Sequence, residues 1–466
     1  MPSSLAVLDT VEYQTLGRKA TMKMDMIIMP ILVIMYILNY LDRQNIASAK
    51  IAGIDADLNL SGVEYQTAVS ILFCGYILMQ VPSNMIVGKI KRPGMYICGG
   101  MAAWGILSAL MAVVHNYAGL LVARVLLGCI EAIFFPGALY FLSLFYNRRQ
   151  FALRTAILYS GSQLGNAFGG LFAIGILRLD GKHGLEGWRW LFLVEGVLTT
   201  GLALLFSLIL PNSNREILGL SKLECTFVQW NLASDQGQHD NTHEITAFKG
   251  FILALTDPKT WLFTGILYST YIVGTLANFF PLVVEGLGYD RTTTYALSAP
   301  PFILCVIAML VNGFHSDRAQ ERFLHIVLPL CVTLVACIIA VSTVNVAARY
   351  VAMMLLPASF YGSSVVTLSW ITAGLSQPAV KRAAAIALIN ALCNTPNVWG
   401  SYLYYGAPRY LTAFVVCLGA TVVAIGFAVV TRIYLGRLNK KLTKGEDMRR
   451  HGPTAAQIAG GFRYTL

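Results

Sequence analysis

The sequence predicts an all-α membrane protein with twelve transmembrane helices in two six-helix halves, and with both termini in the cytoplasm. Of its 466 residues, 56% are hydrophobic and only 12% are charged, whereas a typical soluble domain has about 25% charged residues. The apolar residues occur in runs of roughly 18–25, the length that carries an α-helix across about 30 Å of hydrocarbon. Lys and Arg are concentrated in alternate loops between these runs.

Twelve apolar runs can be placed along the chain, and polar or basic segments separate most of them. They lie near residues 26–48, 64–87, 95–114, 117–145, 154–177, 189–210, 259–285, 296–314, 323–343, 347–373, 380–404 and 408–435. The polar residues before the first run lead directly into a full-length span, so no cleavable signal is expected.

The distribution of basic residues predicts the orientation of these spans. Clusters of Lys and Arg lie before the first span, after the second, fourth, eighth and tenth spans, and after the last. Because cytoplasmic loops carry an excess of Lys and Arg, this alternation places both termini in the cytoplasm. The formal net charge of +11 therefore reflects membrane topology, and no nucleic-acid partner is expected.

The longest polar segment divides the spans into two groups of six. We expect a cytoplasmic tail (1–25), an N-terminal half (26–211), a cytoplasmic linker (212–258), a C-terminal half (259–437) and a second cytoplasmic tail (438–466). Within the linker, Ser221-Lys-Leu-Glu224 has the pattern of a capping box and predicts a short surface helix. A flexible loop is expected after it, from Asp235 to His243.

Four charged residues lie inside predicted spans: Asp42 and Arg43 in the first, and Arg124 and Glu131 in the fourth. A charge at the centre of a bilayer costs roughly 2.5–3.5 kcal/mol on insertion scales, so it persists where it is paired or faces a water-filled path. Arg124 and Glu131 are seven residues apart and share a helix face, and Arg43 lies at a similar depth to Arg124. The planar donor fork of Arg matches a carboxylate, so the two arginines predict a binding site for a small organic anion.

The two acids are candidates for carrying a coupled proton. A buried carboxyl favours its protonated form, whereas a nearby Arg favours the ionised form. A substrate that occupies the Arg would therefore let Asp42 or Glu131 take up a proton. The alternative is a set of structural ion pairs, for example between Asp42 and Arg124, that never contact the substrate.

Second-tier candidates are polar or aromatic residues that would face a central cavity. For each of them, packing or an interhelical hydrogen bond is at least as good an explanation as substrate contact. They are Tyr40, Gln163, Asn166, Trp370, Asn390, Asn394 and Asn397. Gly161, Gly165 and Gly169 recur every four residues and indicate tight helix packing. Asn59-Leu-Ser61 is a glycosylation sequon in the first outer loop.

Other classes of protein are excluded by what the sequence does not contain. It has no nucleotide-binding motif, no nucleophile paired with a base, and no cluster of metal-ligand residues around its nine cysteines. We therefore expect neither an enzyme nor a primary pump, and no cofactor apart from the proton as coupling ion. Two halves joined by a linker favour a secondary carrier with its site near the bilayer midplane. The expected partners are the anion, protons and the lipid bilayer, and the expected state is a monomer.

The segment Gly313-Phe-His-Ser-Asp317-Arg318-Ala-Gln-Glu-Arg322 resembles the signature loop of the major facilitator superfamily. In that loop Gly would permit close helix packing, Asp would accept hydrogen bonds, and the two Arg residues would close a conformational latch. An ordinary cytoplasmic loop would explain Arg318 and Arg322 but not Asp317. The corresponding loop of the first half departs from the pattern, because Arg92 stands where the superfamily usually has Asp.

Three further motifs narrow the resemblance, and it extends from about residue 20 to 440. The segments 39–47 (NYLDRQNIA), 124–137 (RVLLGCIEAIFFPG) and 187–196 (GWRWLFLVEG) resemble the anion:cation symporter family, and most of all its fungal allantoate permease branch. The resemblance implies proton-coupled uptake of a small organic anion, such as allantoate, nicotinate or pantothenate, across the plasma membrane. It also implies that Asp42 and Glu131 act in proton coupling and that Arg43 and Arg124 act in binding or gating. Glu195, in the third motif, is expected to have a structural pairing.

Two other functions remain open on the same scaffold. The first is export of a metabolite or toxin, since the fold supports both directions of transport. The second, a nutrient sensor that does not transport, is less well supported, because only about 30 residues follow the last predicted span and a long signalling tail is expected in such a protein.

Overall fold

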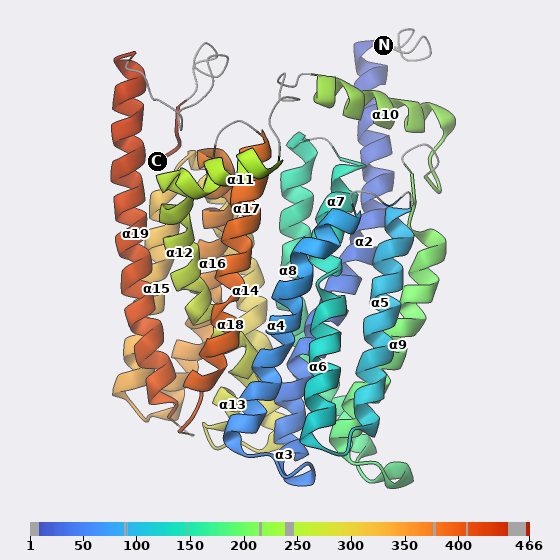
Figure 1. Ribbon diagram of the computed structural model, residues 1–466, viewed down its shortest axis with the longest axis vertical. Coiled ribbons are helices and arrows are strands. Elements are labelled where there is room, and N and C mark those ends of the chain that lie inside the picture. Colours follow the sequence, from blue (N-terminus) through green and yellow to red (C-terminus); the bar gives the residue numbers. More distant parts are fainter. Residues whose placement is uncertain are drawn as a thin grey trace. The chain divides into compact units, whose positions relative to one another are not determined.

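A computed structural model of the chain is predominantly helical in its described part and contains no β-strand there (Figure 1). The structure describes residues 9–87, 90, 92–146, 148–213, 217–237, 247–375, 379–406, 409–445 and 463–466. The chain divides into two compact units, Met1–Asp240 (unit 1) and Asn241–Leu466 (unit 2). The division falls inside the predicted linker 212–258.

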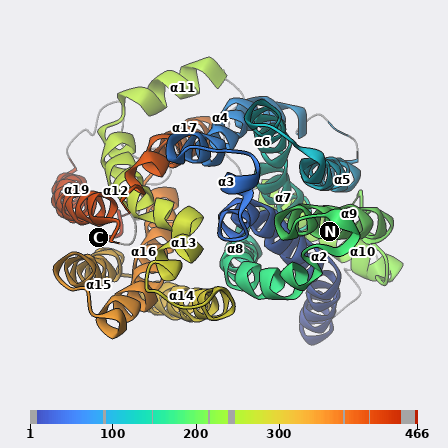
Figure 2. The ribbon, with the colours of Figure 1, turned by 90° about the horizontal axis from the view of Figure 1, so that it is seen from below.

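Unit 1 contains the first six predicted spans, which are seen end-on in Figure 2. Its helices are α2 (Thr10–Ile51), α3 (Ile54–Asp57), α4 (Gly62–Val87), α5 (Pro93–Leu110), α6 (Tyr117–Glu131), α7 (Phe134–Ser143), α8 (Arg148–Ile176), α9 (Gly187–Ile209) and α10 (Lys222–Gly237). The 3₁₀ segments η1 (Met111–Val113), η2 (Leu177–Leu179) and η3 (Lys182–Gly184) extend or connect them.

Unit 2 contains the last six predicted spans. Its helices are α11 (Ala247–Thr256), α12 (Pro258–Gly274), α13 (Phe280–Glu285), α14 (Arg291–Ala319), α15 (Phe323–Ser342), α16 (Val346–Gly374), α17 (Ala379–Asn394), α18 (Pro396–Trp399) and α19 (Leu411–Thr443). The 3₁₀ segment η5 (Thr275–Phe279) joins α12 to α13, and η6 (Gly400–Leu403) follows α18.

Apart from the first, whose helix begins much earlier, the predicted spans correspond to these helices with small shifts at their ends. Ten helical segments of the described chain are long and apolar enough to cross a membrane. The predicted spans at 154–177 and 380–404 are helical as well, because α8 covers the first and α17, α18 and η6 cover the second. The all-α fold predicted from the hydropathy is therefore confirmed.

The first helix begins earlier than the hydropathy suggests. A capping box between Asp9 and Glu12 starts α2, and the helix continues into the first span without a break. The polar residues before Met26 are therefore largely helical. This extension packs on α10: the rings of Tyr13 and Phe227 lie 5.0 Å apart, and Lys23 Nζ donates to Glu224 Oε1 at 2.8 Å.

The capping box predicted in the linker is confirmed. The Ser221 backbone N–H donates to Glu224 Oε2 at 2.7 Å, and the Glu224 backbone N–H donates to Ser221 Oγ at 3.2 Å. These bonds start α10, as a capping box does. The loop predicted from Asp235 to His243 begins inside this helix, and its residues from 238 onward lie outside the described part.

Glycines bring the helices of unit 1 into close contact, as predicted for α8. A Cβ atom at Gly165 would lie 2.6 Å from Tyr40 Cβ, and one at Gly161 would lie 3.2 Å from the Val33 carbonyl oxygen. The crossing of α4 and α6 is tighter still, because a Cβ at Gly128 would overlap the backbone of Leu72. Small residues at such crossings allow the backbones of membrane helices to approach.

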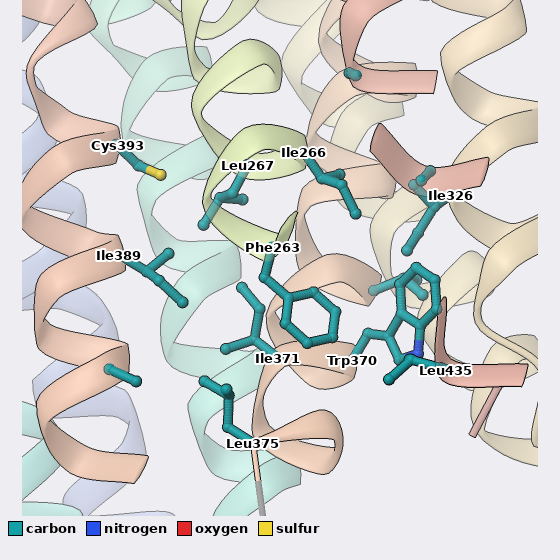
Figure 3. Packing of buried hydrophobic residues seen from close by; sticks show 14 of the residues in the cluster. Phe263, Ile266, Leu267, Ile326, Trp370, Ile371, Leu375, Ile389, Cys393 and Leu435 are labelled. Atoms are coloured by element: carbon teal, nitrogen blue, oxygen red, sulfur yellow. The ribbon is translucent and has the colours of Figure 1, made fainter. Parts of the chain in front are cut away.

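The core of unit 2 is an apolar cluster that a segment near the end of the sequence helps to close. Phe263, Trp370 and Leu435 from three different helices meet in it (Figure 3). Tyr464 belongs to the same cluster and is 3% exposed. The Trp370 Nε1–H donates to the Thr465 carbonyl oxygen at 2.9 Å, so residues 463–466 form a strap against this bundle.

Candidate functional site

An ion pair between α2 and α6 forms the centre of the candidate site in unit 1. Arg43 Nε donates to Glu131 Oε2 at 2.7 Å. The Glu131 side chain is completely buried, and that of Arg43 is 12% exposed. The two residues were predicted to belong to one site, and the structure brings them into direct contact.

Aromatic rings surround the guanidinium group of Arg43. Its Cζ atom lies 4.8 Å from the ring centroid of Tyr76, 5.2 Å from that of Tyr40 and 5.9 Å from that of Phe73. Cation–π contacts of this kind hold a guanidinium group without neutralising its charge. Tyr40 therefore lies beside the predicted anion-binding arginine, and Tyr76 and Phe73 join it from α4.

Arg124 is the more deeply buried of the two arginines, at 1% exposed. Its Nε–H donates to the Ala68 carbonyl oxygen at 3.1 Å, which fixes the side chain against α4. Its Nη1 atom is buried and has no hydrogen-bond partner among the described residues. A buried guanidinium nitrogen without a partner is available to an anion, because burying a charge unpaired is costly.

Asp42 is also 1% exposed and has a neutral partner. Ser108 Oγ on α5 donates to Asp42 Oδ1 at 2.6 Å, and Oδ2 has no partner in the described part of the chain. The ion pair suggested between Asp42 and Arg124 does not form among the described residues. Asp42 contacts α5, whereas Arg43, the next residue on α2, contacts α6. Arg43 therefore pairs with Glu131 instead.

Polar residues directly after Arg43 extend the site toward α8 and α9. Gln44 Nε2 donates to Asn166 Oδ1 at 3.0 Å, and Asn166 Nδ2 lies 3.4 Å from Gln163 Oε1. Asn45 Nδ2 donates to Glu195 Oε2 at 2.6 Å. The sequence analysis did not select Gln44 or Asn45, although both lie in the same polar motif of the first span.

The predicted residues of unit 2 have different surroundings. Asn394 Nδ2 donates to the Asn390 carbonyl oxygen at 2.8 Å, and Asn278 Nδ2 donates to Asn397 Oδ1 at 3.0 Å. These amides therefore form a polar chain in the eleventh predicted span. Trp370 lies in the apolar cluster and is completely buried, with its ring edge-on to Phe263 at 5.5 Å. This packing favours the space-filling interpretation of Trp370 over substrate stacking.

The predicted signature loop, residues 313–322, is the last part of α14 and the turn after it, and it forms an ion pair within itself. Arg322 Nη2 lies 2.6 Å from Asp317 Oδ1, and Arg322 Nη1 donates to Ser316 Oγ at 2.9 Å. Arg318 is exposed. A Cβ atom at Gly313 would meet no described atom within 4 Å, so close helix packing at this glycine stays a prediction. The corresponding loop of unit 1 lies partly outside the described residues.

The sequon residue Asn59 is exposed in the turn between α3 and α4, where its backbone has a positive φ of 50°. Ser61 caps α4 through a hydrogen bond from the Glu64 backbone N–H to its Oγ at 3.3 Å. Exposure is what the predicted modification requires, and its occupancy stays a prediction.

Comparison with known proteins decides the family. Residues 32–401 match the model of the Major Facilitator Superfamily. The chain belongs to the Major Facilitator Superfamily. Among relatives in this superfamily, the "MFS-type transporter cnsO" of Penicillium expansum is 30% identical over 446 residues, covering 92% of this chain and 86% of that protein. The "Major facilitator-type transporter hxnP" of Emericella nidulans is 28% identical, with 94% and 88% covered.

A further relative is an uncharacterized transporter of Schizosaccharomyces pombe, 29% identical over 91% of this chain and 84% of that protein. A solved bacterial homologue of the human lysosomal transporter Spinster has the same fold, with a TM-score of 0.64 and 16% identity. The match covers 90% of this chain and 98% of that structure. The protein is therefore a multi-pass transporter of the Major Facilitator Superfamily and not an enzyme.

Proposed function

We propose that this transporter imports a small organic anion together with one or more protons. The observation that carries the proposal is the ion pair between Arg43 and Glu131, with the unpartnered Nη1 of Arg124 on the same helix as Glu131. A carboxylate that binds an arginine would compete with Glu131 for its positive partner. Glu131 would then be left buried without a cation and would take up a proton.

The proposal gives each group of the site a separate role. Arg43 and Arg124 bind the carboxylate through charge-assisted hydrogen bonds. Tyr40 and Gln163 contact the remainder of the substrate, and Asn394 of unit 2 is a further candidate for such a contact. Asp42 and Glu131 carry protons, and the pair of Asp317 with Arg322 acts in gating. We place the protein in the plasma membrane with both termini in the cytoplasm, as the distribution of Lys and Arg predicts.

The direct test uses the purified full-length protein in liposomes with an imposed inward proton gradient. A panel of labelled carboxylates, including nicotinate, pantothenate and allantoate, is offered outside. Accumulation above the equilibrium level that collapses with a protonophore supports the proposal. If no carboxylate accumulates and cells expressing the protein resist a secreted compound instead, the direction is export and the proposal fails.

A further inference from the structure

A third buried acid, Glu195, lies next to the candidate site and has no positive partner among the described residues. Glu195 on α9 is 1% exposed. Its Oε2 accepts the hydrogen bond from the neutral amide of Asn45, and its Oε1 is buried with no partner in the described structure. The structural pairing expected for Glu195 is therefore a bond to an amide and not an ion pair. A carboxyl in this setting is expensive to keep ionised in a membrane.

Asp42 is in the same situation on the adjacent surface of α2. Its side chain accepts a hydrogen bond from the hydroxyl of Ser108 and lies beside the indole of Trp104, and no positive partner pairs with it in the described structure. Asp42 and Asn45 are three residues apart, so they lie on one face of α2. Asn45 thereby holds the Glu195 carboxyl against the face of α2 that carries Asp42, near enough for the charge of Asp42 to act on it.

Glycines fix the position of both carboxyls at a crossing between α5 and α9. Gly196 directly follows Glu195, and a Cβ atom there would overlap the backbone of Ala109. Ala109 directly follows Ser108, the hydroxyl donor to Asp42. A Cβ at Gly105 would lie 2.6 Å from Thr200 Oγ1, which shows that the helices touch on both sides of this crossing. Helix approach thus sets the separation of the two acids.

The other charged groups around Asp42 and Glu195 do not fully neutralise the negative charge of these two acids. Arg124 and Glu131 interact electrostatically with Asp42, and Arg43 is engaged with Glu131. Among these described neighbours, three carboxyls (Asp42, Glu131 and Glu195) stand against two guanidinium groups (Arg43 and Arg124). The other buried charged groups described in unit 1, Arg189 and Glu224, are paired elsewhere, with Glu186 and Lys23. If one of the three carboxyls keeps its proton, these five side chains together carry no net charge. Two neighbouring carboxyls cannot both ionise easily, so the proton resides with them.

We propose that Asp42 and Glu195 hold one proton jointly and that Glu195 is a proton-carrying residue of the transport cycle. The proposal deepens the function given above and rests on it. Binding of the proton forms one O–H bond on either carboxyl, and its release breaks that bond without any further reactant. The two groups titrate as a coupled pair, so removal of one changes the behaviour of the other.

The first test measures protonation without transport. Infrared difference spectroscopy of the purified full-length protein in liposomes follows the C=O band of protonated carboxyl groups while the pH is varied. We expect the wild type to lose this band in separate steps. In Glu195→Gln the step at higher pH disappears. In Asp42→Asn the remaining step, at Glu195, moves to lower pH by about one unit or more, because the repelling carboxylate of Asp42 is gone.

Thr199→Val is the matched control. Thr199 lies one turn beyond Glu195, is completely buried, and has a hydroxyl without a partner among the described residues. Its replacement removes a buried polar atom but no carboxyl, and it should leave the band and its titration unchanged.

If Glu195→Gln does not fold, Asn45→Ala removes the donor to Glu195 without a change of charge and should shift the same band. An unchanged titration in the folded variant, Glu195→Gln or its substitute, overturns the proposal.

The second test measures transport and separates the two proposals. In the liposome assay, Glu195→Gln should shift the pH dependence of gradient-driven uptake by about one unit or more while counterflow exchange continues. If Glu195→Gln alters the infrared titration but no carboxylate is transported by the wild type, the shared proton stands and the proposed substrate class fails. If carboxylate uptake is normal and both profiles are unchanged in Glu195→Gln, only the role of Glu195 fails.

Discussion

Arg43 and Glu131, on different helices and 88 positions apart in the sequence, form a 2.7 Å ion pair in the interior of unit 1. Each charge compensates the other, so that both can lie buried in the membrane. Loss of either partner therefore has a larger consequence than loss of both, because a single remaining charge stays buried without compensation.

The first prediction concerns the stability of this pair. Arg43→Leu should destabilise the protein by about 3–5 kcal/mol, because it leaves Glu131 buried and unpaired. The double variant with Arg43→Leu and Glu131→Gln should recover most of that loss. Thermal unfolding of the purified proteins in detergent measures both effects. Equal instability of the single and double variants would show that Arg43 stabilises the helices through packing and not through the pair.

The second prediction separates anion binding from proton coupling. Glu131→Gln should abolish accumulation driven by a proton gradient but retain counterflow exchange, since the amide cannot carry a proton. Arg124→Ala should reduce both, with a loss of apparent affinity of about 10- to 100-fold, because a charge-assisted hydrogen bond is lost. Uptake and counterflow in liposomes measure the two activities. Normal gradient-driven accumulation by Glu131→Gln would end its role as a coupling acid.

The third prediction tests the close crossing of α4 and α6, which positions Arg124 against the Ala68 carbonyl oxygen. Gly128→Ala forces a Cβ atom into the backbone of Leu72 and should cost about 1–3 kcal/mol or more. Gly99→Ala on α5 is the control, because its Cβ atom would meet no described atom within 4 Å. The unfolding temperature of each variant provides the comparison. Similar temperatures for both variants would contradict the tight crossing.

The fourth prediction concerns the strap. Tyr464 Oη accepts a hydrogen bond from Lys259 Nζ at 3.2 Å, and the ring is buried in the apolar cluster. Tyr464→Ala should destabilise unit 2 by about 3–5 kcal/mol. Tyr464→Phe keeps the ring and should cost only about 0.5–1.5 kcal/mol. Limited proteolysis and thermal unfolding measure the difference, and equal effects of the two variants would assign the stabilisation to the hydroxyl alone.

The fifth prediction is a pH dependence outside the membrane. Burial raises the pKa of Glu224, but hydrogen bonds from Lys23 and Ser221 outweigh it and hold the pKa below the ordinary value of 4.5. A lowered pKa in the folded state stabilises the fold above 4.5, and this contribution is lost as the pH falls through the lower folded value. The hydrogen-exchange protection of α10, corrected for the intrinsic pH dependence of amide exchange, should therefore fall in acid below about 4.5. Lys23→Met should weaken this dependence, and an unchanged acid response in that variant would refute the assignment.

The membrane-spanning helices and the charged residues of the candidate site could be predicted from the sequence. Apolar runs predict spans directly, because a bilayer requires about 20 residues for each crossing. Charged residues inside those runs, such as Arg43 and Glu131, are conspicuous because they are costly. The capping box at Ser221 is local, so four residues of sequence decide it.

The pairing of the charged groups could not be predicted in the same way. Whether Asp42 or Arg43 faces α6 depends on the rotation of α2 against its neighbours, and a difference of one residue changes the answer by about 100°. The start of α2 was missed because polar residues before Met26 are stabilised by packing on α10, which hydropathy does not register. Trp370 was selected as an aromatic residue in a span, but its burial depends on contacts with Thr465, which lies far away in the sequence.

The strap has a consequence for how the protein is made and handled. Lys259 and Tyr464 are 205 positions apart, so the apolar cluster of unit 2 waits for the synthesis of residues that follow its last long helix. Until then the cluster that contains Phe263 and Trp370 lacks the Tyr464 ring. The Leu466 carbonyl oxygen accepts a hydrogen bond from the Arg322 backbone N–H at 3.0 Å. A reporter protein joined directly to Leu466 would therefore disturb this contact with Arg322.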